Sequence, residues 1–105
     1  GGAGIFCKTQ RFADIVRGGL RMFPHLHPSQ VRVLRPGGAQ RLSDFMTGLS
    51  VLIVSPDYLS YATPDDRAAL TAFTESGGAV IPYHHQIDKG SYMYVEEKIA
   101  ALTKG

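Results

Sequence analysis

The run Leu49–Tyr58 constrains the fold of this chain more than any other stretch of the sequence. It reads Leu-Ser-Val-Leu-Ile-Val-Ser-Pro-Asp-Tyr, with uninterrupted apolar residues from Val51 to Val54. A run that is short, β-branched and not alternating is typical of a strand buried on both faces, as in a parallel sheet covered by helices. Pro56 cannot donate a ladder hydrogen bond and favours extended geometry before it, so the strand is expected to end there.

Three more strands are predicted, at Gly4–Cys7, Val31–Arg35 and Ala79–Tyr83. Val31–Arg35 alternates apolar with basic residues, which suits a strand at a sheet edge. Ala79–Tyr83 contains a proline, which also places it at an edge or near its own end. The other two strands are the most uniformly apolar and are expected inside, so the predicted strand order is 2-1-3-4.

Helices are predicted between and after these strands. Apolar residues at helical spacing run from Phe12 to Phe23, before Pro24, and a short second helix carries Leu42 to Leu49. Thr63-Pro64-Asp65-Asp66 is the clearest helix start, and Gly77-Gly78 marks that helix's end. A last helix, to Leu102, follows the cap-like Asp88–Ser91. The pattern predicts a three-layer α/β sandwich with a four-stranded parallel sheet flanked by helices, in the flavodoxin or Rossmann-like class.

Composition narrows the classes of function. The 105 residues suffice for a single domain, and the formal charge of +2, with scattered basic residues, gives no reason to propose a nucleic-acid surface. No apolar run approaches the length of a membrane helix. The single cysteine suits a reducing cytoplasm. The abrupt Gly-Gly-Ala-Gly start leads us to expect a domain excised from a longer chain.

The predicted strand order places a ligand site between the first and third strands, where the topology switches direction. Polar side chains there could bind a small polar or anionic metabolite, and backbone N–H groups at the helix start could assist. Turn chemistry and solvated charges are the alternative interpretation. The candidate ligand-binding residues are Lys8, Thr9, Arg11, Ser55, Asp57, Tyr58, His84 and His85.

Cys7 raises the possibility of an enzyme or phosphocarrier. Small tyrosine phosphatases need an arginine six residues after the cysteine, where this chain has Ala13. Sugar phosphotransferase carriers use a Gly/Ser-rich loop, and Lys8–Phe12 contains neither residue. A buried structural cysteine is the favoured interpretation. No histidine spacing matches a zinc pattern, and neither a metal nor a cofactor is predicted.

Two segments resemble the C-terminal sensor domain of GntR-type bacterial transcription regulators. They are Leu52–Pro56, a strand ending in Val-Ser-Pro, and Val80–Ile99, a strand followed by Ile-Asp-Lys-Gly-Ser and a helix. The resemblance implies an effector-binding, dimerising α/β domain without catalysis, whose regulated DNA binding belongs to a winged helix absent from this chain. The rival hypotheses are a small enzyme or phosphocarrier using Cys7 and a protein-interaction module.

Overall fold

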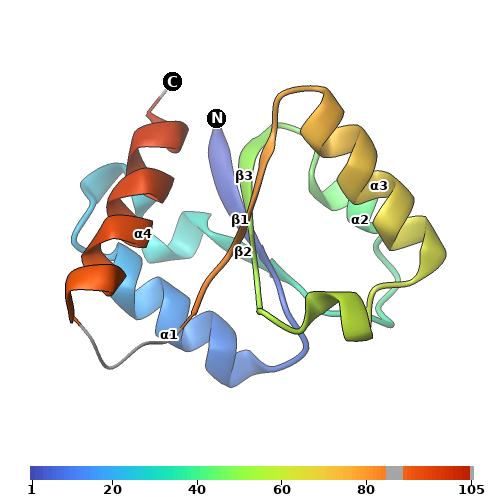
Figure 1. The fold of residues 1–105 in the computed structure, drawn as a ribbon, viewed down its shortest axis with the longest axis horizontal. Coiled ribbons are helices and arrows are strands. Elements are labelled where there is room, and N and C mark those ends of the chain that lie inside the picture. Colours follow the sequence, from blue (N-terminus) through green and yellow to red (C-terminus); the bar gives the residue numbers. More distant parts are fainter. Residues whose placement is uncertain (85–88, 105) are drawn as a thin grey trace.

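The computed structural model describes residues 1–84 and 89–104, and for residues 89–94 it describes the backbone alone. Their strands form one four-stranded parallel sheet with the order β2-β1-β3-β4 (Figure 1), as the sequence predicts. The strands are β1 (Gly2–Phe6), β2 (Arg32–Leu34), β3 (Leu49–Val54) and β4 (Ala79–Pro82).

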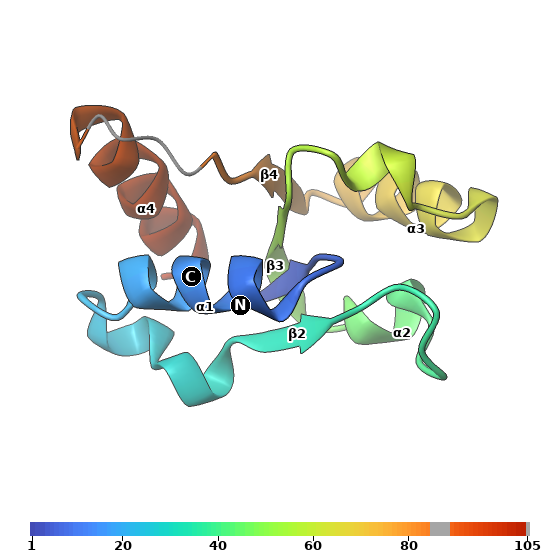
Figure 2. The same cartoon turned by 90° about the horizontal axis from the view of Figure 1, so that it is seen from below.

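Helices cover both faces of the sheet. One face carries α1 (Gln10–Leu20) and α4 (Lys89–Thr103), and the other carries α2 (Leu42–Phe45) and α3 (Pro64–Glu75) (Figures 1 and 2). Short 3₁₀ turns lie between them: η1 (Pro24–Leu26), η2 (Pro28–Gln30) and η3 (Tyr58–Ser60). The three-layer α/β sandwich is therefore confirmed.

The central strand β3 is buried on both faces. Val51, Leu52, Ile53 and Val54 have no exposed surface. Val51 and Ile53 belong to the core under α1 and α4, whereas Leu52 and Val54 belong to the core under α2 and α3. Ile53 is paired with Ile5 on one side and with Ile81 on the other, so isoleucines are aligned across β1, β3 and β4. Every residue of this run has to be apolar, because successive side chains point alternately into the two cores.

The start of α3 has the predicted cap. The Thr63 hydroxyl accepts a hydrogen bond from the Asp66 N–H at 3.1 Å, and the Asp66 carboxylate accepts one from the Thr63 N–H at 3.0 Å. Pro64 occupies the first turn, where a missing N–H costs no helical hydrogen bond. At the other end Gly77 has a φ of 98°, a left-handed conformation that glycine adopts without strain.

The region after α1 departs from the prediction. The helix ends at Leu20 rather than continuing to Phe23, and Phe23 packs against the core from the connection that follows. The connection that follows contains η1 and η2. His25 Nε2 lies 3.0 Å from the Ala100 carbonyl oxygen and 3.1 Å from the Thr103 hydroxyl, so this segment is tied to the end of α4. Such contacts join residues far apart in sequence, which local spacing does not reveal.

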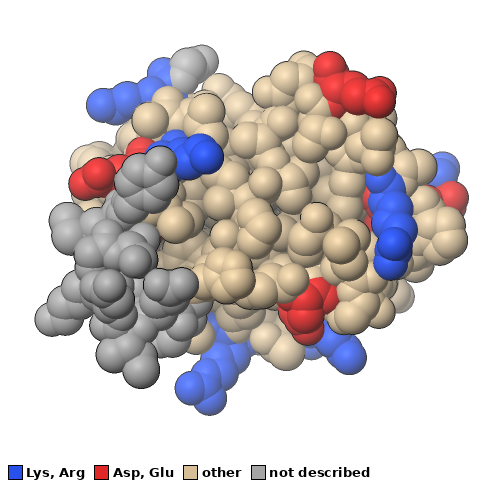
Figure 3. Space-filling model, in the orientation of Figure 1, with Lys and Arg blue, Asp and Glu red and all other residues tan. Residues whose placement is uncertain are grey.

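The charged residues on the face shown in Figure 3 lie mostly around its margin, with both signs interspersed and an uncharged centre. Among the described residues on this face, Lys and Arg form no extended basic patch of the kind that binds a nucleic-acid backbone. In the part of the chain that the structure describes, no helix has both the length and the apolar character needed to cross a bilayer.

Candidate functional site

The predicted crevice between the ends of β1 and β3 holds a hydrogen-bonded network. Ser55 is buried, and its hydroxyl lies 2.5 Å from the hydroxyl of Tyr61. The Tyr61 hydroxyl also donates to the Phe6 carbonyl oxygen at 3.4 Å, while its ring packs edge-on against the Phe6 ring. Burial raises the pKa of Tyr61, which favours the protonated hydroxyl that can donate. The Ser55 hydroxyl is thus engaged inside the protein.

The other predicted ligand residues lie on the expected connections. Thr9 caps α1 by accepting a hydrogen bond from the Phe12 N–H at 3.3 Å. Thr9 is exposed, as are Lys8, Arg11, Asp57 and His84, and Tyr58 is half-buried. His85 falls outside the described residues. In the structure Thr9 caps a helix and Ser55 makes an internal hydrogen bond. Ligand binding by these residues therefore stays a prediction.

Cys7 lies in surroundings that disfavour a nucleophilic thiolate. The residue has no exposed surface, and its Sγ donates to the Thr9 carbonyl oxygen at 3.2 Å. Burial raises the pKa of the thiol, and the contact with Thr9 offsets this only in part. A reactive cysteine needs an accessible thiol with a lowered pKa, and Cys7 has neither property.

We therefore expect the native protein to react slowly with iodoacetamide at neutral pH. The matched control is the same protein in denaturant, where the exposed Cys7 thiol should be alkylated at the rate of a free cysteine. Mass spectrometry after timed quenching measures both rates. Equal rates in the two states, or turnover of a phosphate ester that Cys7→Ser abolishes, would contradict this prediction.

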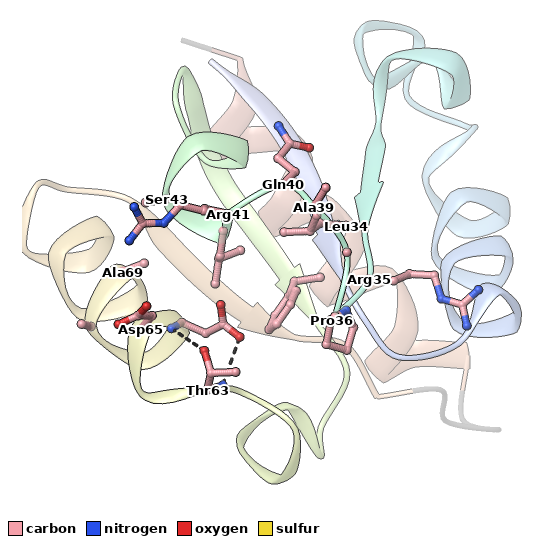
Figure 4. Close-up of a pocket in the computed structure, with 16 residues that line it drawn as sticks. Leu34, Arg35, Pro36, Ala39, Gln40, Arg41, Ser43, Thr63, Asp65 and Ala69 are labelled. Carbon is pink, nitrogen blue, oxygen red and sulfur yellow. Dashed lines mark hydrogen bonds between the residues drawn. The ribbon is translucent and has the colours of Figure 1, made fainter.

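A pocket of about 440 Å³ lies beside this crevice, on the face covered by α2 and α3 (Figure 4). Its walls are residues 34–43, which connect β2 to α2, and the first two turns of α3 with Thr63 before them. The large apolar side chains among its lining residues are Phe6, Leu34 and Leu42, and all three are buried. None of the eight predicted ligand residues is among its described lining residues. We call this site the α2–α3 pocket.

The pocket exists because the connection from β2 to β3 contains very little helix. Crossovers between parallel strands usually carry a helix long enough to cover the sheet, but α2 has only 4 residues. The preceding segment, Arg35–Arg41, is a loop that turns at Gly37, whose φ is 83°. The space beside α3 is therefore walled by a loop, and a cavity remains at the carboxyl edge of the sheet. This is where ligands of α/β proteins commonly bind.

Arg41 and Asp65 supply the pocket's unengaged charges. Figure 4 shows both side chains at the same rim, with Ala69 between them. Among the described residues, neither side chain has a hydrogen bond or an ion pair. The other two charged lining residues are engaged: Asp66 caps α3, and Arg35 turns away to donate two hydrogen bonds to the Lys8 carbonyl oxygen, at 3.1 and 2.9 Å.

The sequence pattern does not predict this pocket. Pro36-Gly37-Gly38 has the composition of a strand end, and Arg41 is one of several scattered basic residues. A usable signal was the length of the connection, since seven residues, Arg35–Arg41, precede a helix of one turn. The position of Asp65 and Arg41 at the same rim depends on how α3 packs, which the sequence pattern does not reveal.

The parallel sheet, its strand order and the helices on both faces define a Rossmann-like α/β domain. The family model of the YmtS Rossmann-like domain matches residues 4–105, and the chain belongs to that family. No curated protein and no solved structure matches the chain. The family description names neither a ligand nor DNA, so the resemblance to GntR-type sensor domains stays a prediction.

Proposed function

We propose that this domain binds a small polar molecule in the α2–α3 pocket and works as a sensor, without catalysing a reaction. The observation that carries the proposal is the pocket itself: a cavity of about 440 Å³ at the carboxyl edge of a parallel sheet. Its volume falls in the range of small-molecule sites, roughly 300–1,000 Å³. It also combines an apolar lining with a few polar groups that have no partner within the described protein, which is the usual composition of such sites.

The sensor role extends the resemblance to GntR-type regulators. In that proposal the domain forms a homodimer in the cytoplasm, and an attached DNA-binding domain responds to the occupied pocket. The rival hypothesis, an enzyme or phosphocarrier using Cys7, has less support because the thiol is buried and its pKa is raised.

Filling the pocket tests this proposal. Gly38→Leu and Ala68→Leu add bulk from opposite walls, and we expect each to weaken binding of the native ligand at least tenfold. A Cβ at Gly38 meets only the Arg35 carbonyl oxygen, at an ordinary 3.6 Å, and Ala68 is an exposed helical position, so both variants should fold. A thermal-shift screen of amino acids, carboxylic acids, sugar phosphates and nucleotides identifies the ligand, and calorimetry measures its affinity.

Gly18→Leu is the matched control, because a Cβ at this position on α1 meets nothing within 4 Å and the site is remote from the pocket. It should leave the affinity unchanged. A ligand that binds equally well to wild type, Gly38→Leu and Ala68→Leu occupies another site, and the proposal is then wrong. In that case Arg11→Ala, which should weaken binding in the predicted crevice, tests that location.

A further inference from the structure

We infer that the α2–α3 pocket binds a zwitterion with an apolar substituent, of the class of free apolar α-amino acids. The inference rests on the proposed function and names its ligand class. In this arrangement Arg41 receives the carboxylate, Asp65 receives the ammonium group, and the substituent enters the apolar groove between α2 and α3.

The charges of the pocket favour a ligand that carries both signs. Two arginines (Arg35 and Arg41) and two aspartates (Asp65 and Asp66) line it, so its formal charge is zero. A purely anionic ligand would face two carboxylates, and a purely cationic one would face Arg41. A zwitterion can place its carboxylate at Arg41 and its ammonium group at Asp65, the lining arginine and the lining aspartate without a partner among the described residues. Arginine suits a carboxylate well because its planar fork can donate two parallel hydrogen bonds.

The N-terminus of α3 is a weak competitor for the anion, because in its first turn only the Asp65 N–H has no partner among the described residues. Pro64 has no N–H, and the Asp66 N–H is already bonded to the Thr63 hydroxyl. Asp65 and Asp66 also place negative charge at this end, where it offsets the helix dipole. The α3 wall is therefore the acidic side of the pocket, and the loop with Arg41 is the basic side.

A groove that could hold an apolar substituent lies next to the charged side chains of Arg41 and Asp65. A second, shallower cavity of about 200 Å³ lies between α2 and α3 and shares Ser43 and Ala69 with the pocket. Its apolar lining comes mainly from Met46, Ala72 and Phe73. Because Ala69 lies between Arg41 and Asp65 in Figure 4, a substituent that leaves the charged rim over Ala69 enters this groove. Transfer of an aliphatic or aromatic group from water to such a groove is favourable.

Leucine and two truncated analogues separate the contributions of the two charges. 4-Methylpentanoic acid lacks the ammonium group, and 3-methylbutylamine lacks the carboxylate. We expect calorimetry on the wild-type protein to show that leucine binds roughly ten- to a hundredfold more tightly than either analogue, the usual effect of losing one charge-assisted contact. Glycine, which has no substituent to place in the groove, should also bind more weakly than leucine.

Three variants assign each contact. Arg41→Gln should weaken leucine and 4-methylpentanoic acid but leave 3-methylbutylamine unchanged, and Asp65→Asn should show the reverse pattern. Ala72→Leu, at an exposed helical position, fills the groove and should weaken leucine while leaving glycine unchanged. The controls Arg21→Gln and Glu75→Gln remove a charge of each sign outside the pocket and should have no effect.

The outcomes distinguish this inference from the proposed function. If leucine, methionine and phenylalanine give no binding heat at millimolar concentration, the inference is wrong. It is also wrong if Arg41→Gln and Asp65→Asn leave leucine binding intact. If another class of ligand binds and is lost in Gly38→Leu, the proposed function stands and only the ligand class fails. If every bound ligand is indifferent to Gly38→Leu and Ala68→Leu, both proposals fail.

Discussion

Replacing Ile53 with alanine is expected to lower the free energy of unfolding by roughly 2–5 kcal/mol, the usual cost of such a core truncation. Ile53 has no exposed surface and lies on the central strand between Ile5 and Ile81. Its removal leaves a cavity bounded by neighbouring strands on both sides and by the α1 and α4 layer. Those elements are held by the sheet ladder, so the site has little freedom to collapse. Urea unfolding followed by circular dichroism measures the loss.

Leu59→Ala is the control for that prediction. It removes a branched aliphatic side chain of similar size, but the side chain is 49% exposed on η3. Surface changes of this kind usually alter stability by less than about 0.5 kcal/mol. An Ile53→Ala protein as stable as Leu59→Ala would show that the packing of β3 between two helical layers is wrong.

Gly19→Ala is expected to destabilise the protein by about 1–3 kcal/mol, because it overpacks a closed site. A Cβ at Gly19 would overlap Glu96 Oε1 and lie 2.8 Å from the Tyr83 hydroxyl oxygen. Both groups are buried, and the Tyr83 hydroxyl donates to Glu96 Oε1 at 2.7 Å. Alanine would force the two polar groups apart, and a buried carboxyl that loses a hydrogen bond is costly.

The neighbouring residue is a matched control. Gly18 lies on the same helix, and a Cβ there meets nothing within 4 Å. Gly18→Ala should therefore stabilise the protein by about 0.5–1 kcal/mol, since alanine has the higher helix propensity. Chemical denaturation of the two variants should give shifts of opposite sign. Two shifts of the same sign would show that α4 does not pack on α1 at Gly19.

Much of the fold could be predicted because it depends on local sequence. The unalternating run in β3, the proline in β4 and the alternating second strand together gave the correct strand order. The start of α3 could be predicted from four consecutive residues, since its cap joins Thr63 to Asp66 within a single turn. The end of α1 was misplaced, because Phe23 is apolar at helical spacing yet reaches the core from outside the helix.

The candidate site was less predictable than the fold. The topological switch point predicts a site at the connections after β1 and β3, where the Ser55 hydroxyl is bonded to Tyr61. The α2–α3 pocket instead lies beside that crevice, in the space left by a one-turn α2. Loop residues such as Arg41 carry no periodic signal, so their position in space has no counterpart in the sequence pattern.

The sequence by itself determined the parallel sheet, its order and the caps of α3, because strand burial, proline geometry and helix capping are set by residues close together in the chain. Only the tertiary structure decided which polar groups meet. Residues distant in sequence come together at three places: Glu96 meets Tyr83 and Gly19, His25 contacts the end of α4, and Arg41 lies at the same rim as Asp65. Their proximity follows from how helices of different length pack on the two faces of the sheet, and that packing is a property of the whole core.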